Sequence, residues 1–384
     1  MDNREMKQEN EAGKRSQKRK RHRMKKKGRL RMVFTILLLI LLVLAGGLAL
    51  FYSFGKSRLK SKTSGMSPQL ILEQAAEAEG NQSTEAAAAA EWDEDWIGYN
   101  GKVYQYNEDI MTFLIMGIDQ SGEVKLQEEG TDGGQADAIF LAVLNPHTHS
   151  MKLIGINRDT MTDVDVYSYF GNYVNTTTQQ IALQHSYGDG GAKSAEYMVK
   201  AVSNLMFQLP ISGYCAINMD AVSEINDAVG GVTLTCLEDI STSGSKYHKG
   251  ISLKKDEEVH LEGDAAFWYV KWRDTKEFES ARNRLARQKQ YLSAFVDQAK
   301  AALKEDMTLP VTMLNQLSKY IITDLSANEI TYLASEAVSY TFGSNDIYSL
   351  EGETKLGNLN EEFYPDKDAL NELIIEVFYE EVVR

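Results

Sequence analysis

An uninterrupted apolar run covers residues 32–54 of this 384-residue sequence. Its 23 residues carry no charge, and a helix of that length, rising ~1.5 Å per residue, spans the ~30 Å hydrocarbon layer of a bilayer. A cleaved signal peptide is the alternative, but its apolar core is usually ~7–15 residues long, and no small-x-small cleavage site follows the run. The run therefore predicts one uncleaved N-terminal transmembrane helix.

Shorter apolar runs recur after residue 98. Phe113–Ile118, Ala138–Leu144 and Met151–Ile156 are continuous, which is typical of strands buried on both faces. Residues 192–209 and 277–300 instead repeat apolar positions every 3.6 residues, which predicts helices. Strands alternating with helices predict an α/β layered fold. Further helices are expected at 179–185, 220–229, 326–339 and 366–381, and further strands at 161–169, 214–219 and 231–237.

Charge divides the chain into two parts. Residues 1–31 hold 14 lysines and arginines against 4 acidic residues, a balance of +10, whereas the whole chain carries −14. Because residues 32–54 are uncharged, everything after them carries −24. The positive-inside rule places the basic tail in the cytoplasm and the acidic part outside the cell membrane. Basic runs beside a span usually contact anionic membrane lipid, so we expect no nucleic-acid partner.

The acidic part is predicted to be one extracytoplasmic domain behind a linker. Residues 55–98, rich in Ser, Gly, Gln, Glu and Ala, have no apolar pattern that builds a core. Residues 99–384 then form the domain, with a core over about 110–300 and a C-terminal subregion over 301–384. The only cysteines, Cys215 and Cys236, allow one bridge at most, which excludes a disulfide-built module.

Residues that could bind a metal ion or phosphate lie at the ends of predicted strands. Asp119 and Asp137 flank two of them, and Arg158 and Asp159 follow a third. Carboxylates in such positions suit a hard cation such as Mg²⁺, and an arginine suits a forked contact with phosphate. Solvated turn acids, and an arginine next to a carboxylate that only caps a turn, remain open interpretations from spacing alone.

Positive charge is concentrated at residues 271–289, which hold seven basic and three acidic side chains within a domain of opposite sign. This local reversal indicates an anionic ligand, with a solvated basic face as the alternative. On the helix predicted from residue 277, Gln288 falls inside the apolar stripe and Arg284 at its edge. A buried polar site is therefore expected there, because an inward-facing amide needs hydrogen-bond partners.

These candidates belong to an ordered set of motifs that covers roughly residues 110–295. The set comprises Phe113–Asp119, Asp137–Val143, Ile156–Thr160, Ile225–Val232, Leu261–Gly263 leading to Tyr269–Arg273, and Arg284–Gln288. In this order and spacing, behind an N-terminal anchor, the set resembles the LytR-CpsA-Psr family of bacterial envelope proteins.

The resemblance implies an α-β-α layered domain with a central mixed β-sheet, and a pocket that takes a polyprenyl chain with its phosphates at the mouth. The implied activity is that of a membrane-anchored phosphotransferase, which moves a teichoic acid or capsule-like glycopolymer from an undecaprenyl-pyrophosphate carrier to peptidoglycan. It further implies Mg²⁺ at Asp119 and Asp137, and catalytic roles for Arg158 and Asp159. Substrate contacts are implied for Arg158, Lys271, Arg273, Arg284, Arg287 and Gln288.

The chain departs from the family pattern at cationic positions. Gln135 and Gln180 stand where the family usually has a cation, and Lys271 replaces an arginine, which keeps the charge but loses the fork. A non-catalytic envelope protein that binds polyprenyl phosphates is therefore the alternative function. A transcriptional regulator is a further alternative, supported only by the basic residues 14–31.

Overall fold

The computed structural model describes residues 52–70, 96–127, 133–242, 250–274, 276–358 and 360–382. The chain divides into two compact units, Met1–Phe54 and Gly55–Arg384. Of the first unit only residues 52–54 are described, and they are helical. In the described ranges no helix combines the length and apolarity that a membrane crossing needs. The span predicted at 32–54 lies, apart from its last three residues, outside those ranges.

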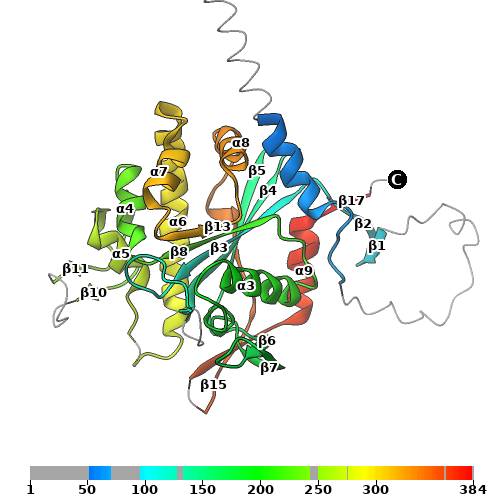
Figure 1. The fold of residues 1–384 in the computed structure, drawn as a ribbon, viewed down its shortest axis with the longest axis horizontal. Helices are drawn as coiled ribbons and strands as arrows, with labels where there is room; N and C mark the ends of the chain where they lie inside the picture. Colours follow the sequence, from blue (N-terminus) through cyan, green and yellow to red (C-terminus); the bar gives the residue numbers. More distant parts are fainter. Residues whose placement is uncertain are drawn as a thin grey trace, which may run out of the picture. The chain divides into compact units, whose positions relative to one another are not determined.

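A six-stranded mixed sheet forms the centre of the second unit, as the resemblance implied (Figure 1). The inner strands β3, β4 and β5 are antiparallel neighbours, whereas β8 runs parallel to β3 and β14 parallel to β5. The three apolar runs of the sequence form β3, β4 and β5, which confirms those predictions. In spatial order the strands are β13 (Ile321–Thr323), β8 (Gly213–Asn218), β3 (Met111–Ile118), β4 (Ala136–Asn145), β5 (Ser150–Ile156) and β14 (Ile347–Ser349).

Helices cover both faces of this sheet (Figure 1). Helices α3 (Ala192–Leu205) and α9 (Lys367–Phe378) bury their apolar stripes against one face, where Leu114, Ile139 and Ile154 are fully buried. The opposite face turns towards α6 (Ser280–Glu305), whose Leu285 packs close to Gly155 of β5. The result is a helix–sheet–helix layering in which each helix presents one apolar stripe to the sheet.

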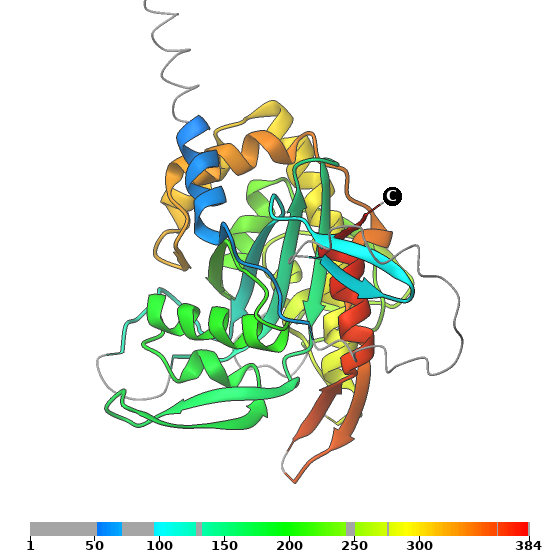
Figure 2. The same ribbon diagram turned by 90° about the vertical axis from the view of Figure 1, so that its right-hand side faces the viewer.

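The remaining elements surround this core. Two hairpins, β6–β7 and β15–β16, project at the same end of the domain (Figure 2), and a bridge between Thr160 and Phe363 joins them at their base. Their strands are β6 (Met161–Tyr167), β7 (Tyr173–Gln180), β15 (Gly352–Leu356) and β16 (Glu361–Pro365). The other strands are β1 (Trp96–Tyr99), β2 (Lys102–Tyr106), β9 (Val232–Thr235), β10 (Ile240–Ser241), β11 (Ser252–Leu253), β12 (Glu258–Leu261) and β17 (Tyr379–Glu381). In the described ranges the other helices are α2 (Leu183–Ser186), α4 (Ala221–Ala228), α5 (Asp264–Lys271), α7 (Leu309–Leu317), α8 (Ala327–Ala337), a 3₁₀ turn at Ser344–Asp346 and the helical residues 52–63.

A β-bulge interrupts the pairing of β3 with β4 next to the candidate residues. Gly117 pairs with Ala138 and Ile118 with Ala136, so Asp137 between them has no cross-strand partner. Regular alternation would point Asp137 to the same face as Ile139, into the apolar core beneath α3 and α9. The bulge instead turns its carboxylate towards α6, because the extra residue re-aims the side chain.

Several predicted elements differ from the structure at their ends, and at two places the difference is larger. The helix expected at 179–185 is mostly absent: β7 continues to Gln180, and α2 begins only at Leu183. Val174 and Thr176–Thr178 are β-branched and favour a strand, and β6 supplies its hairpin partner. The predicted linker also starts with ordered structure, because residues 52–63 are helical and Leu59 is fully buried. Lys62 of that helix pairs with Asp324 at 2.8 Å and with Glu329 at 3.3 Å.

Candidate functional site

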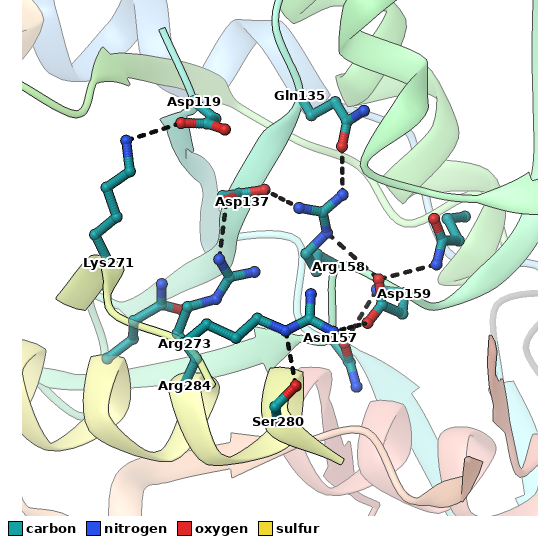
Figure 3. Close-up of polar contacts among 12 residues, drawn as sticks. Asp119, Gln135, Asp137, Asn157, Arg158, Asp159, Lys271, Arg273, Ser280 and Arg284 are labelled. Atoms are coloured by element: carbon teal, nitrogen blue, oxygen red, sulfur yellow. Dashed lines mark hydrogen bonds and ion pairs between the residues drawn. The ribbon is translucent and has the colours of Figure 1, made fainter. Parts of the chain in front are cut away.

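The end of β3, the start of β4 and the end of β5 lie at the same edge of the sheet, because the three strands are antiparallel neighbours. Asp119, Asp137 and Arg158 therefore meet there, as Figure 3 shows. The backbone N–H of Asp119 donates to the carbonyl of Gln135 at 2.9 Å, which holds the two strand ends together. The structure therefore brings these three sequence candidates together at one place.

Asp137 is the centre of the cluster. Its side chain is buried, with one oxygen bonded to Arg158 and the other accepting from Arg284 of α6 at 2.8 Å. Arg158 also donates to the amide oxygen of Gln135, a position where the family pattern has a cation. Burial lowers the pKa of the Arg284 guanidinium, and Asp137 opposes this by pairing with it. Two guanidinium groups thus face one carboxylate, which leaves donor capacity for an anion.

Asp159 lies beside Arg158 in the same cluster. One oxygen accepts from Gln180 at 2.9 Å and lies 3.4 Å from Arg158, while the other lies 3.9 Å from Arg273. Its backbone N–H donates to the side chain of Asn157 at 3.0 Å. Burial raises the pKa of the Asp159 carboxyl above its usual range, against the opposing charge of the nearby arginines. A carboxylate with a raised pKa suits a proton acceptor.

Lys271 and Arg273 reach the cluster from the C-terminal end of α5. Lys271 contacts Asp119 at 3.0 Å, and both side chains are partly exposed. Arg273 donates to Ser280 of α6 at 2.8 Å and lies 3.7 Å from the carboxylate of Glu361. These contacts join β3, α5, α6 and the β15–β16 hairpin at one place.

Arg287 and Gln288 do not join the cluster. Arg287 is 1% exposed, donates to the carbonyls of Tyr269 and Trp272, and pairs with Glu238. Gln288 is buried, as the sequence predicted, and donates to the carbonyl of Val270 at 3.1 Å. Both side chains therefore hold the carbonyls at the end of α5, the segment that carries Lys271 and Arg273. The geometry assigns Arg287 a positioning role rather than the substrate contact implied by the resemblance.

Two cavities are lined by neighbours of Asp137: Arg158, which is bonded to Asp137, lines the first, and Ala138, which follows Asp137, lines the second. A polar cavity of about 700 Å³ opens over Arg158, Asp159 and Arg273. An apolar cavity of about 320 Å³ lies between the sheet and α6, and Gln288 contributes to its lining. Its apolar wall comes from both layers and includes Ile115, Phe140, Cys215, Leu292, Phe295 and Val296. Cys215 and Cys236 are both free thiols, in agreement with the absence of a disulfide framework.

The described residues contain no cluster of three or more His, Cys, Asp or Glu side chains arranged to hold a metal ion. Asp119 and Asp137 nevertheless offer hard oxygen donors, and Asp137 is bonded to Arg158 of the polar cavity. Mg²⁺ is commonly held by one or two carboxylates and completes its shell with waters and phosphate oxygens. These two residues therefore fit a cation that arrives together with a phosphate ligand.

A sequence model of the LytR_cpsA_psr family matches residues 71–375, which is most of the chain. This protein belongs to the LytR-CpsA-Psr family. Two curated relatives, each named polyisoprenyl-teichoic acid–peptidoglycan teichoic acid transferase TagU, are 28% identical. The one from Halalkalibacterium halodurans matches over 66% of this chain and 73% of its own length. The one from Bacillus cereus matches over 62% and 67%, respectively.

The crystal structure of B. subtilis TagV superimposes with a TM-score of 0.54 at 24% identity, covering 70% of this chain and 96% of TagV. This likeness supports the LytR-CpsA-Psr fold alone.

The polar cavity of this LytR-CpsA-Psr protein also includes residues that sequence reasoning missed. Phe278, Leu356, Asn360 and Glu361 line its outer wall. Gly357 and Asn358 are turn residues, so a turn at this point could be predicted from the sequence. The contact of the β15–β16 hairpin with Asp159, about 200 residues earlier in the chain, could not be predicted, because no sequence pattern near either segment indicates it.

Proposed function

We propose that this protein is a membrane-anchored phosphotransferase of the cell wall, which moves a glycopolymer from an undecaprenyl-pyrophosphate carrier to peptidoglycan. The observation that carries this proposal is a pair of cavities next to Asp137, one lined by its partner Arg158 and the other by Ala138, the residue that follows it. An apolar cavity suits a polyprenyl chain, and a cation-lined polar cavity suits phosphates and sugar. The names of the TagU relatives support the same donor and acceptor classes.

The reaction is a displacement at phosphorus. A hydroxyl oxygen of peptidoglycan attacks the phosphorus that carries the glycopolymer, and a new P–O bond forms while the bond to the lipid phosphate breaks. Polyprenyl monophosphate leaves, and the hydroxyl proton passes to a base. Asp159 is the base that we propose, because it faces the polar cavity with a raised pKa. Arg158 and Arg284 orient the pyrophosphate and stabilise its developing charge.

The charge balance of the cluster favours a divalent cation. Four cationic side chains face four carboxylates, so the site has no net formal charge before an anion enters. The eight groups are Arg158, Lys271, Arg273 and Arg284 against Asp119, Asp137, Asp159 and Glu361. We propose that Asp119 and Asp137 hold Mg²⁺, which supplies positive charge to the pyrophosphate when bound.

We also propose that the N-terminal segment anchors the protein as predicted, with residues 1–31 in the cytoplasm, a span at 32–54 and the domain outside the cell membrane. Protease treatment of intact spheroplasts tests this topology. Digestion of the domain with survival of an epitope placed at residue 1 is the expected result, and protection of the domain would contradict it.

The enzymatic proposal is tested with the full chain in detergent micelles. A polyprenyl-pyrophosphate glycan, a peptidoglycan acceptor and MgCl₂ are supplied, and both polymer transfer and release of lipid monophosphate are measured. We expect transfer by wild type and its loss in Arg158→Ala. If wild type gives neither product, or if Arg158→Ala equals wild type, the enzymatic function is wrong.

A non-catalytic polyprenyl-phosphate binder is the second candidate, favoured by one observation. Gln135 and Gln180 use their neutral amides on Arg158 and Asp159, so the cluster has fewer cations than the family pattern implies. The same experiment separates the two functions, since tight lipid binding without product would support the binder.

A further inference from the structure

A second polar cavity, of about 310 Å³, lies at the sheet edge opposite the candidate site. Met111, the first residue of β3, and Pro146, which follows β4, line it, whereas Asp119 and Asp137 lie at the other ends of these strands. Helical residues 55–63, α8 and the segment between β2 and β3 supply the rest of its wall. Both views place this helix at the end of the domain opposite the β6–β7 and β15–β16 hairpins (Figures 1 and 2). The cavity is therefore separate from the site proposed for transfer.

The helix at residues 55–63 packs closely against α8. A Cβ atom at Gly55 would lie 2.5 Å from the carbonyl oxygen of Asn328, so only glycine permits this approach of the two backbones. The side chain of Leu59 is fully buried, and the ammonium of Lys62 forms an ion pair with a buried carboxylate of α8. The helix that forms one side of the cavity is therefore part of the packed domain.

The cavity lies next to the point where the predicted membrane span ends. That span ends at Phe54, so Lys56 lies at most ~3 Å and Lys60 at most ~9 Å beyond it along a helix that rises ~1.5 Å per residue. The headgroup layer is about 5–7 Å thick on each side of the hydrocarbon core. Because a lysine side chain is long enough to bring its ammonium to the membrane interface, both lysines reach the lipid headgroups.

Two lysines and two carboxylates line the cavity, and only one of each is paired. Asp109 accepts a hydrogen bond from Lys60 and bonds to Nε2 of His147 at 2.6 Å, and these contacts hold the pKa of its carboxyl below the usual range. Lys56 and Glu108 are exposed, and neither forms a hydrogen bond or ion pair with any residue that the structure describes. The cavity thus offers one ammonium and one carboxylate to a ligand.

A zwitterionic headgroup matches this pair of charges. An anionic headgroup would leave Glu108 without a partner, and a choline ammonium has no N–H to donate to it. The ethanolamine headgroup carries both a phosphate and an ammonium with three N–H donors. We propose that the cavity binds phosphatidylethanolamine of the outer leaflet, with Lys56 contacting the phosphate and Glu108 accepting from the ammonium. The proposal rests on the proposed membrane topology and adds a specific lipid partner to it.

Native mass spectrometry of the full chain in nonionic detergent measures the binding of a single lipid molecule. Phosphatidylethanolamine, phosphatidylcholine and phosphatidylglycerol with identical acyl chains are titrated, so that only the headgroup differs. Excess geranyl diphosphate, a short analogue of the proposed carrier, occupies the apolar cavity throughout. The variants are Lys56→Gln and Glu108→Gln. The matched control, Lys254→Gln, removes the same charge at a side chain that is 59% exposed and outside the cavity lining.

We expect wild type to bind phosphatidylethanolamine about fivefold more tightly than the other two lipids, the effect of one charge-assisted hydrogen bond at an exposed site. Lys56→Gln should weaken binding of phosphatidylethanolamine and phosphatidylcholine alike by about fivefold, because both lose the phosphate contact. Glu108→Gln should weaken only phosphatidylethanolamine. Lys56→Arg keeps the charge and should bind within about twofold of wild type.

Three results overturn the headgroup site: equal affinity of wild type for the three lipids, tighter binding of phosphatidylglycerol, or an equal loss in Lys254→Gln. None of them affects the transfer reaction, which the release of lipid monophosphate tests separately. Protection of the domain from protease in spheroplasts is a different result. It removes the proposed topology, and the outer leaflet as the source of the lipid with it.

Discussion

Replacing Arg287 by Met tests whether this side chain contacts the substrate, as the resemblance implies, or holds the end of α5 in place, as the structure indicates. Arg287 is 1% exposed, its guanidinium donates to two carbonyls at the end of α5, and it pairs with Glu238. Its guanidinium carbon also lies 5.4 Å from the ring centre of Trp272. A methionine of similar length fills the space but leaves these acceptors and one carboxylate without a partner.

The cost follows from burial. Removing one member of a fully buried ion pair typically costs about 3–5 kcal/mol of unfolding free energy. Glu238 keeps 24% of its side-chain exposure and regains water, so the ion pair itself falls at the low end. Each of the two deprived carbonyls adds about 1 kcal/mol. We expect a total of about 5 kcal/mol, which lowers the melting temperature of a domain of this size by about 10–20 °C.

Thermal unfolding of the full chain in detergent, followed by calorimetry, measures this loss. Arg282→Met is the matched control, because Arg282 lies on the same helix, is 71% exposed, and pairs with Glu279 only at 3.3 Å. We expect it to change stability by less than about 0.5 kcal/mol. If Arg287→Met melted like wild type and bound geranyl diphosphate at least tenfold more weakly, the side chain would contact the ligand and the positioning role would be wrong.

Three further predictions concern the site and its support. Asp159→Asn should lower the transfer rate by about 10²–10⁴-fold while geranyl diphosphate still binds. Because burial raises the pKa of Asp159, the wild-type rate should fall as the pH drops through that pKa and the base becomes protonated. A wild-type rate that does not change with pH would contradict this. EDTA should abolish transfer and MgCl₂ restore it, with Asp119→Asn raising the Mg²⁺ concentration needed for half-maximal rate; a rate indifferent to EDTA would exclude the cation. Burial lowers the pKa of His185, so this side chain stays neutral in the folded protein, whereas in the unfolded chain it is protonated below about pH 6.5. The free energy of unfolding should therefore fall below that pH, by up to about 1.4 kcal/mol per pH unit. His185→Gln should flatten this slope, and an unchanged slope in the variant would refute the assignment.

The central strands and most of the polar residues of the cluster could be predicted from the sequence, because both depend on local pattern. The continuous apolar runs that form β3, β4 and β5 are each bounded by turn residues, and the polar residues at their ends follow directly. The helical period of α6 also placed Gln288 in the apolar stripe, where its side chain is buried. Such features need no information about distant parts of the chain.

Arg287 shows where this reasoning stops. It lies three positions after Arg284 in the same basic stretch, yet Arg284 contacts Asp137 and Arg287 contacts the end of α5. Side chains three residues apart on a helix point in similar directions, so the position of α5 decides which of the two contacts the cluster. The start of α6 was misplaced for a similar reason. Glu279 adopts φ +58°, in the left-handed region, and its backbone N–H is held by Glu361 of the distant hairpin.

The unpartnered position of Asp137 in the β3–β4 pairing has a consequence for engineered hybrids of this domain. The start of β4 has one residue more, over residues 136–138, than regular pairing with Gly117 and Ile118 needs. Deleting Ala136 would restore regular pairing, place Asp137 opposite Ile118 and send its side chain towards α3 and α9. The loop at 120–134 lies outside the ladder, so changes in its length leave that count untouched. Segment exchange with relatives should therefore succeed or fail on the number of residues carried across this short stretch, whatever their identity.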